Sequence, residues 1–372
     1  MPFYSYSTAF PALNIVVLQD RLRSGGTERQ SVLLADAFTA KGHPATLLTF
    51  RPGGALAATL AHAGQISLQR FDTGLDWFAP GLSKTLRQLK PKVILCMGRM
   101  ANCHAGSIQK RFPECAVIAT MRTGKPLPWA FRRSLSKVRH IIANSQQARS
   151  ALTERYGVAD DRITVINNSV VFRPDPRAAS GPATRADHGV GSQTVVLLCV
   201  AMFRPEKNQR ELIEIMDGFS SDDDIQLWLA GDGPTLSECE ILVEERGLQN
   251  RVRFLGWLPD PSAAYAAADI AVHASWSEAL SNFIIEAQAH GLPAVVYDAQ
   301  GNSECMIPGK TGFIIPPGDR KQFRATILEM AREDKETRAR RSALASSFAR
   351  TSFDHSRQVT AYLNLFRSLG AH

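Results

Sequence analysis

Short, continuous apolar runs alternate with stretches of helical period along the first half of the chain. The runs predict strands at 13–18, 45–50, 92–97, 116–121, 140–143 and 163–166. Residues 28–41 instead place Val32, Ala35 and Phe38 on one side, which indicates an amphipathic helix. Because the strands are apolar throughout and alternate with helices, we expect a parallel sheet covered on both faces.

The same pattern begins again in the second half. Apolar runs predict strands at 195–200, 225–230, 252–255, 270–273 and 294–297, and the intervening periodicity predicts helices at 208–219, 235–247 and 283–290. Residues 320–369 are helical in composition, with no further strand pattern. The fold class is therefore α/β, with two doubly wound, Rossmann-like parallel sheets. Such sheets bind ligands beyond the carboxyl ends of their strands, so we expect a central cleft between the two units.

The composition between the two patterns marks a boundary. Residues 173–193 are rich in Pro, Gly, Ala and charged side chains and have no periodicity, which predicts a linker at 176–193. The first domain is then 1–175 and the second 194–354. A length of 372 residues suits two such domains. The last segment, 355–372, is a helix that we expect to pack back on the first domain.

The net charge differs sharply between the halves. Residues 1–184 contain 24 Lys and Arg against 10 Asp and Glu (24 − 10 = +14), and residues 185–372 contain 19 against 25 (19 − 25 = −6). The basic residues are densest at 84–139. A field of this sign attracts an anionic lipid surface or a nucleic acid, and charge alone does not choose between them.

Other features narrow the class of protein. No run of apolar residues is long enough for a membrane-spanning helix, and the N-terminus lacks the pattern of a secretory signal. The six cysteines form no CxxC pair, which favours reduced thiols over disulfides or a zinc site. These features predict a cytoplasmic protein.

The most informative stretch is 274–293. Asn282 is a suitable N-cap for a helix that ends near Gly291, so the amides around Leu280, Ser281 and Asn282 would form a helix entrance that attracts phosphate. Glu286 follows one turn inside and could accept hydrogen bonds from ribose hydroxyls. It could equally be a carboxylate that only complements the helix dipole. Glu278 precedes the helix and could reach another part of the same ligand.

The segment SEALSNFIIEAQAHGLPAV, with Glu278 and Glu286, resembles the E-x7-E signature of the family-4 retaining glycosyltransferases of GT-B fold. Further segments similar to that family follow one another in the expected order over nearly the whole chain. They are the motifs at 25–28 (GGTE), 142–145 (IANS), 165–168 (VINN), 204–208 (RPEKN) and 230–234 (AGDGP), and Glu304.

The resemblance implies a role for each matching residue. Lys207 would bind the donor diphosphate and, with Arg204 and Glu278, form the catalytic group, while Glu278 contacts the donor sugar. Glu286 would hold the ribose. The backbone at Leu280, Ser281, Asn282, Gly26 and Gly231 would surround the nucleotide. A lysine at position 207 would otherwise be interpreted as an ordinary solvated side chain.

Two positions depart from the family pattern. The family usually has an arginine where this chain has Met202, and Arg204 is two positions away as a possible substitute. Many members also have a histidine at the end of a first-domain strand, where this chain has Arg122. A guanidinium could bind an acceptor hydroxyl or phosphate, but it cannot act as a base at neutral pH.

Three further features allow more than one interpretation. Gly25 with Gly26 is either a plain tight turn or, as in the family, a loop that faces diphosphate and acceptor. Residues 222–224 are three aspartates in a polar turn, and we expect no metal there. Trp129 and Arg132 lie in the basic segment, on a mixed surface helix or on a patch that contacts membrane and acceptor.

We therefore expect a retaining, metal-independent glycosyltransferase that needs no cofactor besides its donor substrate. It would move a sugar from a nucleotide-diphosphate donor to a glycolipid or lipopolysaccharide precursor, as a peripheral protein on the inner face of the cytoplasmic membrane. One alternative is a nucleotide-sugar epimerase of similar two-domain fold, and another is a binding relative without activity. A basic nucleic-acid-binding protein is a third, although no nucleic-acid recognition motif is visible.

Overall fold

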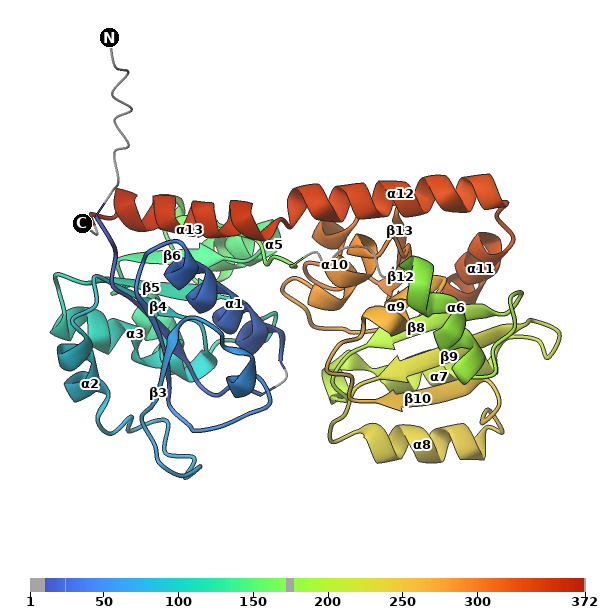
Figure 1. Cartoon of the computed structure of the whole chain (residues 1–372), viewed down its shortest axis with the longest axis horizontal. Coiled ribbons are helices and arrows are strands. Elements are labelled where there is room, and N and C mark those ends of the chain that lie inside the picture. The colour runs from blue at the N-terminus through green and yellow to red at the C-terminus, as the bar shows by residue number, and fades with distance from the viewer. Residues whose placement is uncertain (1–10, 24, 172–176, 371–372) are drawn as a thin grey trace, which may run out of the picture.

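The computed structural model describes residues 11–23, 25–171 and 177–370, and they form two α/β domains side by side (Figure 1). The first sheet has seven parallel strands in the order β3-β2-β1-β4-β5-β6-β7. Its strands are β1 Ile15–Gln19, β2 Ala45–Thr49, β3 Gly64–Ser67, β4 Val93–Cys96, β5 Ala116–Met121, β6 His140–Ala143 and β7 Ile163–Val165.

The second sheet has six parallel strands in the order β10-β9-β8-β11-β12-β13. They are β8 Val195–Val200, β9 Ile225–Ala230, β10 Val252–Gly256, β11 Ile270–His273, β12 Ala294–Tyr297 and β13 Gly312–Ile315. Both orders reverse direction beside the first strand of their domain, which is the doubly wound topology. The predicted fold class is confirmed.

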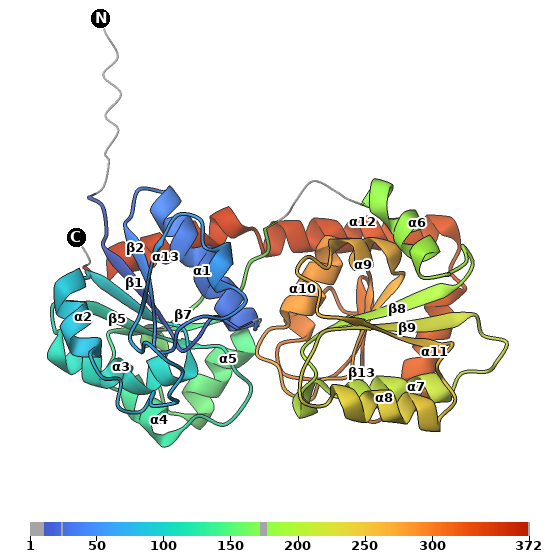
Figure 2. The same cartoon turned by 60° about the horizontal axis from the view of Figure 1, so that its bottom comes forward.

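Helices cover both faces of each sheet (Figure 2). In the first domain they are α1 Gly26–Ala40, α2 Leu82–Leu89, α3 Arg99–Arg111, α4 Trp129–Leu135 and α5 Gln146–Ser150. In the second they are α6 Arg177–Asp187, α7 Gln209–Asp217, α8 Leu236–Glu245, α9 Ser262–Ala267, α10 Asn282–Ala289, α11 Arg320–Ala331 and α12 Lys335–Ser352. The last helix is α13 His355–Ser368.

The first sheet has a separate apolar core on each face because successive strand residues point to opposite sides. Val16 and Leu18 of β1 face the core under α2, α3 and α4, whereas Ile15 and Val17 face the core under α1. The core under α1 also contains side chains of α13. Phe366 of α13 contacts Phe38 of α1, with ring centroids 5.6 Å apart.

The segment predicted to be a linker contains a helix, and that part of the prediction is wrong. Helix α6 packs on α9 in the second domain, where Gly181 approaches the backbone so closely that a Cβ there would lie 2.6 Å from the carbonyl oxygen of Ala266. Arg185 donates hydrogen bonds to the carbonyl of Ala267 and to Asp269. Glycine and proline disfavour a helix by propensity, and these tertiary contacts override them.

The chain crosses between the domains twice. Helix α12 packs on the second domain, α13 packs on the first, and the two follow each other along one side of the molecule (Figure 1). The earlier crossing lies beside the later one, because the amide of Val170 donates to the carbonyl of Phe353 at 3.1 Å. Within the described residues, no helix is both long enough and apolar enough to span a membrane.

The α13 contacts predict a domain-specific loss of stability. Phe366 is fully buried, so Phe366→Ala should lower the free energy of unfolding of the first domain by about 3–5 kcal/mol, through lost burial and the cavity left behind. Chemical denaturation measures this loss. Leu344→Ala on the exposed side of α12 is the matched control and should change it by less than about 1 kcal/mol. Equal losses for both variants would contradict the assignment of α13 to the first core.

Candidate active site

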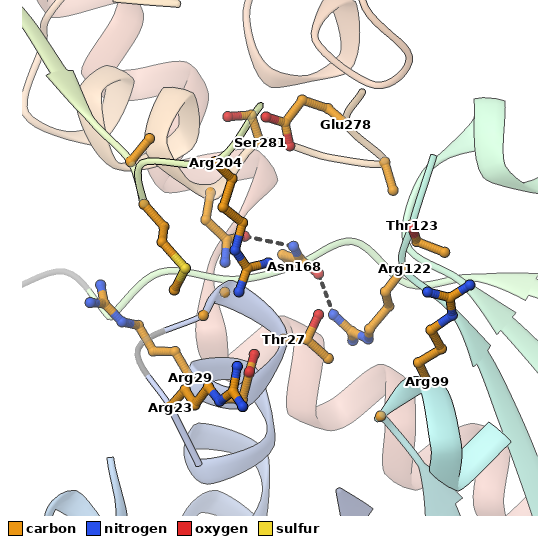
Figure 3. Close-up of a pocket in the computed structure, with 18 of the residues that line it drawn as sticks. Arg23, Thr27, Arg29, Arg99, Arg122, Thr123, Asn168, Arg204, Glu278 and Ser281 are labelled. Atoms are coloured by element: carbon orange, nitrogen blue, oxygen red, sulfur yellow. Dashed lines mark hydrogen bonds between the residues drawn. The ribbon is translucent and has the colours of Figure 1, made fainter. Parts of the chain in front are cut away.

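A cleft of about 800 Å³ lies between the domains, and it is lined from both sides. Its walls are built largely from segments that follow the carboxyl ends of the strands, those of all seven strands in the first domain and of β8, β9, β10 and β11 in the second. Figure 3 shows side chains of both domains directed toward this space. The position agrees with the rule that parallel α/β sheets bind ligands beyond their strand ends.

A buried carboxylate forms the centre of the second-domain wall. Glu278 is only 8% exposed, and its Oε1 accepts from the Nζ of Lys207 at 2.5 Å and lies 2.8 Å from the Nε2 of His273. Lys207 follows β8, and His273 is the last residue of the neighbouring strand β11. Three residues from two adjacent strand ends therefore form one charged group.

The electrostatics of this group follow from burial and proximity. Burial opposes ionisation of Glu278, but the Lys207 ammonium and the His273 hydrogen bond more than offset it and hold the pKa of that carboxyl well below its usual range. Burial lowers the pKa of His273, so the imidazole is neutral at pH 7. A neutral imidazole that donates from Nε2 orients the carboxylate and adds no charge.

Glu286 lies one turn inside α10, and its carboxylate has hydrogen-bonding partners from both domains. Its Oε2 accepts from the hydroxyl of Tyr265 at 2.9 Å, and its Oε1 lies 3.1 Å from Nη1 of Arg29 on α1. A carboxylate has about four acceptor sites, so capacity remains for a ligand hydroxyl. Burial and the neighbouring Glu286 carboxylate raise the pKa of Tyr265 well above its usual value, so its hydroxyl stays a donor.

The N-terminus of α10 opens on the cleft. Ser281, not Asn282, is the N-cap residue, and its side chain makes no capping hydrogen bond. Because the N-cap side chain does not bond to them, the first-turn amides are available to bind an anion. The side chain of Asn282 instead accepts from Nδ2 of Asn168 at 2.6 Å. Gly26 lies close to this side chain, because a Cβ at position 26 would lie 2.6 Å from Nδ2 of Asn282.

The remaining residues predicted to bind the donor, Leu280 and Gly231, line the same cleft, and so does Gly25, which was predicted on the acceptor side. Gly231 has a φ of +142°, and a Cβ there would lie 2.1 Å from the carbonyl oxygen of Ala201. Met202 also lines the cleft, and Arg204 points into it (Figure 3). Arg204 therefore occupies a position from which its guanidinium can reach a diphosphate.

Arg122 follows β5 and lies on the first-domain wall. Its Nη1 donates to Oδ1 of Asn168 at 2.5 Å (Figure 3). Its Nη2 donates to the hydroxyl of Tyr362 on α13 at 2.8 Å. The C-terminal helix therefore positions a side chain of the cleft. Arg122 is a positioned cation, and it cannot take the acceptor proton.

Two predicted residues lie outside the cleft lining. Trp129 is 72% exposed at the first residue of α4, and Arg133 stacks on its ring at 5.3 Å. Arg132 donates from Nε to the carbonyl of Leu127. The aspartates 222–224 lie in a turn away from the cleft, where Asp224 accepts from Thr194. Among the residues that the structure describes, no group of three His, Cys, Asp or Glu side chains could hold a metal ion.

Contacts across the cleft join the two domains. Lys125 pairs with Glu206 at 2.7 Å. Glu304 of the second domain accepts from the amides of Gln146 and Gln147 at 2.7 and 3.0 Å, so it caps the N-terminus of α5 in the first domain. Glu304, noted in the sequence only as part of a motif, is therefore an interdomain contact.

Four partners of the predicted residues escaped sequence reasoning. They are Arg29, Tyr265, His273 and Tyr362, whereas Asn168 belongs to the motif at 165–168 but had no role assigned to it. Each is far from its partner in the chain or lies on an apolar strand or short helix, where one polar residue indicates nothing specific. A polar residue at the carboxyl end of a predicted strand, as at His273, is the one signal that could have drawn attention.

Comparison with known proteins decides the family. A family model described as glycosyltransferase family 4 matches residues 24–171, and one described as glycosyl transferases group 1 matches residues 182–346. The chain belongs to the family-4 glycosyltransferases of GT-B fold. It is a glycosyltransferase, and these matches do not favour the epimerase or the nucleic-acid-binding protein.

Individual relatives agree over most of their length. A lipopolysaccharide core biosynthesis glycosyltransferase of Rhizobium meliloti, LpsD, is 29% identical over 351 residues, which are 92% of this chain and 95% of LpsD. The Anabaena protein HepE, crystallised with UDP and glucose, matches with a TM-score of 0.80 at 21% identity, over 96% of this chain and 100% of HepE. The lipopolysaccharide outer core galactosyltransferase WaaB has a TM-score of 0.67 at 16% identity, over 95% and 99% of the two chains. The two structures share the fold of this glycosyltransferase.

The Lys207–Glu278 pair predicts a stability change that depends on both partners. Lys207→Met leaves Glu278 buried without its cation and should lower the free energy of unfolding at pH 7 by about 2–3 kcal/mol, measured by chemical denaturation. Lys207→Met with Glu278→Gln should recover part of the loss. The more exposed pair of Lys125 and Glu206 is the control. Lys125→Met should lower the free energy of unfolding by less than about 1 kcal/mol.

The pH dependence of this pair has a definite sign. Because the folded-state pKa of Glu278 is depressed, the pair stabilises the wild type above the usual carboxyl value of 4.5 and loses that contribution as pH falls below it. The gap between wild type and Lys207→Met should therefore narrow in acid. A gap that widens below pH 4.5 would contradict this assignment.

Proposed function

We propose that this glycosyltransferase moves a sugar from a nucleotide-diphosphate donor to a hydroxyl of a glycolipid or lipopolysaccharide precursor, with retention of anomeric configuration and without a metal. The observation that supports it most is the meeting of Lys207, Glu278, Glu286 and the open end of α10 in one cleft. The likeness to LpsD over 92% of the chain supports a lipopolysaccharide core precursor as the acceptor class.

The donor fits the second-domain wall by charge. The α10 amides and the Lys207 ammonium attract the diphosphate, and Arg204 adds a second cation. Glu286, with its remaining acceptor capacity, takes the ribose hydroxyls one turn deeper. Glu278, oriented by His273, accepts hydroxyls of the donor sugar. The first-domain wall, with Arg122, is left for the acceptor.

The reaction then proceeds on one face of the donor sugar. The acceptor oxygen attacks the anomeric carbon from the side on which the diphosphate leaves. The bond from that carbon to the phosphate oxygen breaks, and the acceptor proton passes to that oxygen. Lys207 and the α10 amides stabilise the charge that develops on the leaving group. No protein base is needed, so an arginine at position 122 is compatible with turnover.

The positive charge of the first half indicates where the acceptor would be found. The first half of the chain has a balance of +14 and would attract the anionic inner face of the cytoplasmic membrane, where lipid-linked precursors are found. The protein would then work as a peripheral cytoplasmic enzyme, with nucleotide sugar from solution and acceptor from the membrane. Nucleic acid is not expected as a partner.

A panel of nucleotide sugars identifies the donor. UDP-, GDP- and ADP-sugars are added in turn, and apparent stability is followed by thermal denaturation. A ligand that binds only the native state at about a hundred times its Kd stabilises by about 2.7 kcal/mol, so one class should raise Tm clearly above the others. No stabilisation by any nucleotide sugar would contradict the proposed donor site.

Two substitutions separate binding from catalysis. Lys207→Ala should lower kcat by about 10²–10³-fold, because a charge-stabilising group is lost from the transition state. Glu286→Ala should weaken donor affinity by at least about tenfold through lost hydrogen bonds to a charged acceptor. Lys321→Ala, an exposed lysine on α11, is the control for loss of charge. Wild-type turnover by Lys207→Ala would remove Lys207 from the mechanism.

A further inference from the structure

One short loop of the first domain carries a concentration of exposed apolar side chains. It joins β3 to α2 and projects from the domain (Figure 1). Phe71 is 69% exposed, Leu75 49%, Trp77 59% and Phe78 80%. Single exposed apolar residues are common on protein surfaces, but four within eight residues of one loop are a concentration that indicates a binding surface. We call residues 71–78 the aromatic loop.

Polar contacts hold the other side of the loop against the domain. Asp76 is buried and accepts from Arg51 at 2.8–2.9 Å and from Gln69 at 3.1 Å. Its carbonyl oxygen lies 2.8 Å from Nε2 of His104 on α3. Asp72 pairs with Arg21 and Arg51. The loop therefore pairs both of its acids with arginines and buries Asp76, while its large apolar side chains are exposed.

The basic charge of the chain segment that follows the aromatic loop favours an anionic partner. Residues 77–113, which include α2 and α3, contain seven basic residues and no acid: Lys84, Arg87, Lys90, Lys92, Arg99, Lys110 and Arg111. Arg70 lies over the ring of Phe71 at 5.7 Å, and both acids of the loop are already paired. Aromatic side chains next to cations are the combination that binds the interface of an anionic bilayer. A second copy of the same face would meet it with like charge.

The loop also touches the cleft. Asp76 and its partner Arg51 both line it on the first-domain side. The segment that exposes Trp77 and Phe78 to the surroundings therefore forms, with its buried face, part of the wall assigned to the acceptor. A lipid surface on the loop would lie beside the acceptor side of the cleft.

We propose that the aromatic loop inserts Phe71, Leu75, Trp77 and Phe78 into the interface of an anionic phospholipid bilayer and holds the acceptor side of the cleft at the membrane. This inference rests on the proposed transfer to a lipid-linked acceptor and adds the residues that make the attachment. It differs from the patch around Trp129 predicted from the sequence, where one aromatic side chain is exposed beside Arg133.

The test is cosedimentation of the full-length protein with vesicles of equal parts phosphatidylcholine and phosphatidylglycerol, at low and high salt. Trp77→Ser with Phe78→Ser should lower the partition coefficient at least about tenfold, since two interfacial side chains are removed. The matched control is Ile241→Ser with Leu344→Ser. It removes one exposed apolar residue on α8 and one on α12, and it should leave the partition coefficient unchanged. Trp129→Ser measures the other patch separately.

A spectroscopic measurement reports on insertion itself. Brominated lipids should quench part of the wild-type tryptophan fluorescence, and the conservative Trp77→Phe variant should still bind vesicles but lose that quenched part. Equal partitioning of wild type and the loop variant, or unchanged quenching in Trp77→Phe, would overturn the proposal. Dimers of wild type that the loop variant lacks, on size exclusion without lipid, would assign the loop to self-association and overturn it as well.

The outcomes separate this inference from the proposed function. If nucleotide sugars stabilise wild type and loop variant equally while neither binds vesicles, the membrane role of the loop fails and glycosyl transfer stands. If vesicles bind through the loop but no nucleotide sugar stabilises the protein, the proposed donor site fails instead.

Discussion

The buried carboxylate of Glu278 is the constraint on which the donor half of the cleft depends. A charge in the protein interior is tolerated only when cations and hydrogen-bond donors surround it. Here Lys207 and His273 do so, and they come from the ends of β8 and β11, which are neighbours in the sheet. The charged group therefore exists only when those strands pair, so folding of the second sheet and formation of the site are one event.

Helix α10 connects this group to the first domain. Its open N-terminus faces the cleft, Asn282 in its first turn bonds to Asn168, and Glu286 one turn later pairs with Arg29. A diphosphate at the helix entrance would thus bind beside the contacts that hold the domains together. Arg122 extends this link, because it contacts Asn168 on one side and Tyr362 of α13 on the other. The position of the domains and the geometry of both walls are consequently coupled.

The strands were best predicted where burial on both faces made them mostly apolar. Strands β5, β6, β8, β9, β11 and β12 have the predicted bounds, because a strand covered on both faces has few polar positions to obscure its ends. Strand β3 was missed since it lies at the sheet edge and is largely exposed, with the sequence Gly64 to Ser67. Helix α6 was missed because Gly181 and Pro182 argue against a helix until the contact with α9 is known.

The residues of the site likewise divide into those that the sequence predicts and those that it does not. Lys207, Glu278 and Glu286 could be found because motif spacing links them, whereas Arg29 and Tyr265 depend on tertiary contacts that no spacing encodes. The aromatic loop shows the reverse limit. Phe71, Leu75 and Phe78 have the i, i+4, i+7 spacing of an apolar helix face, and an apolar residue in a sequence is more often core than surface. Their exposure and the burial of Asp76 on the opposite side of the loop reveal which way they face.

The second half of the chain is acidic, yet this charge is compatible with an anionic donor. The reason is that a nucleotide sugar and a lipid surface would interact with the protein over different distances. The second half has a balance of −6, yet a donor in the cleft would lie next to Lys207, Arg204 and the helix entrance, which all line it. Exposed charges farther away than about 8–10 Å are largely screened at physiological salt. A lipid surface instead meets many exposed cations of the first half at once, so the sum of charge matters there. A strongly basic first half and a locally positive pocket in an acidic second half would therefore serve the two partners proposed above, the membrane and the nucleotide sugar.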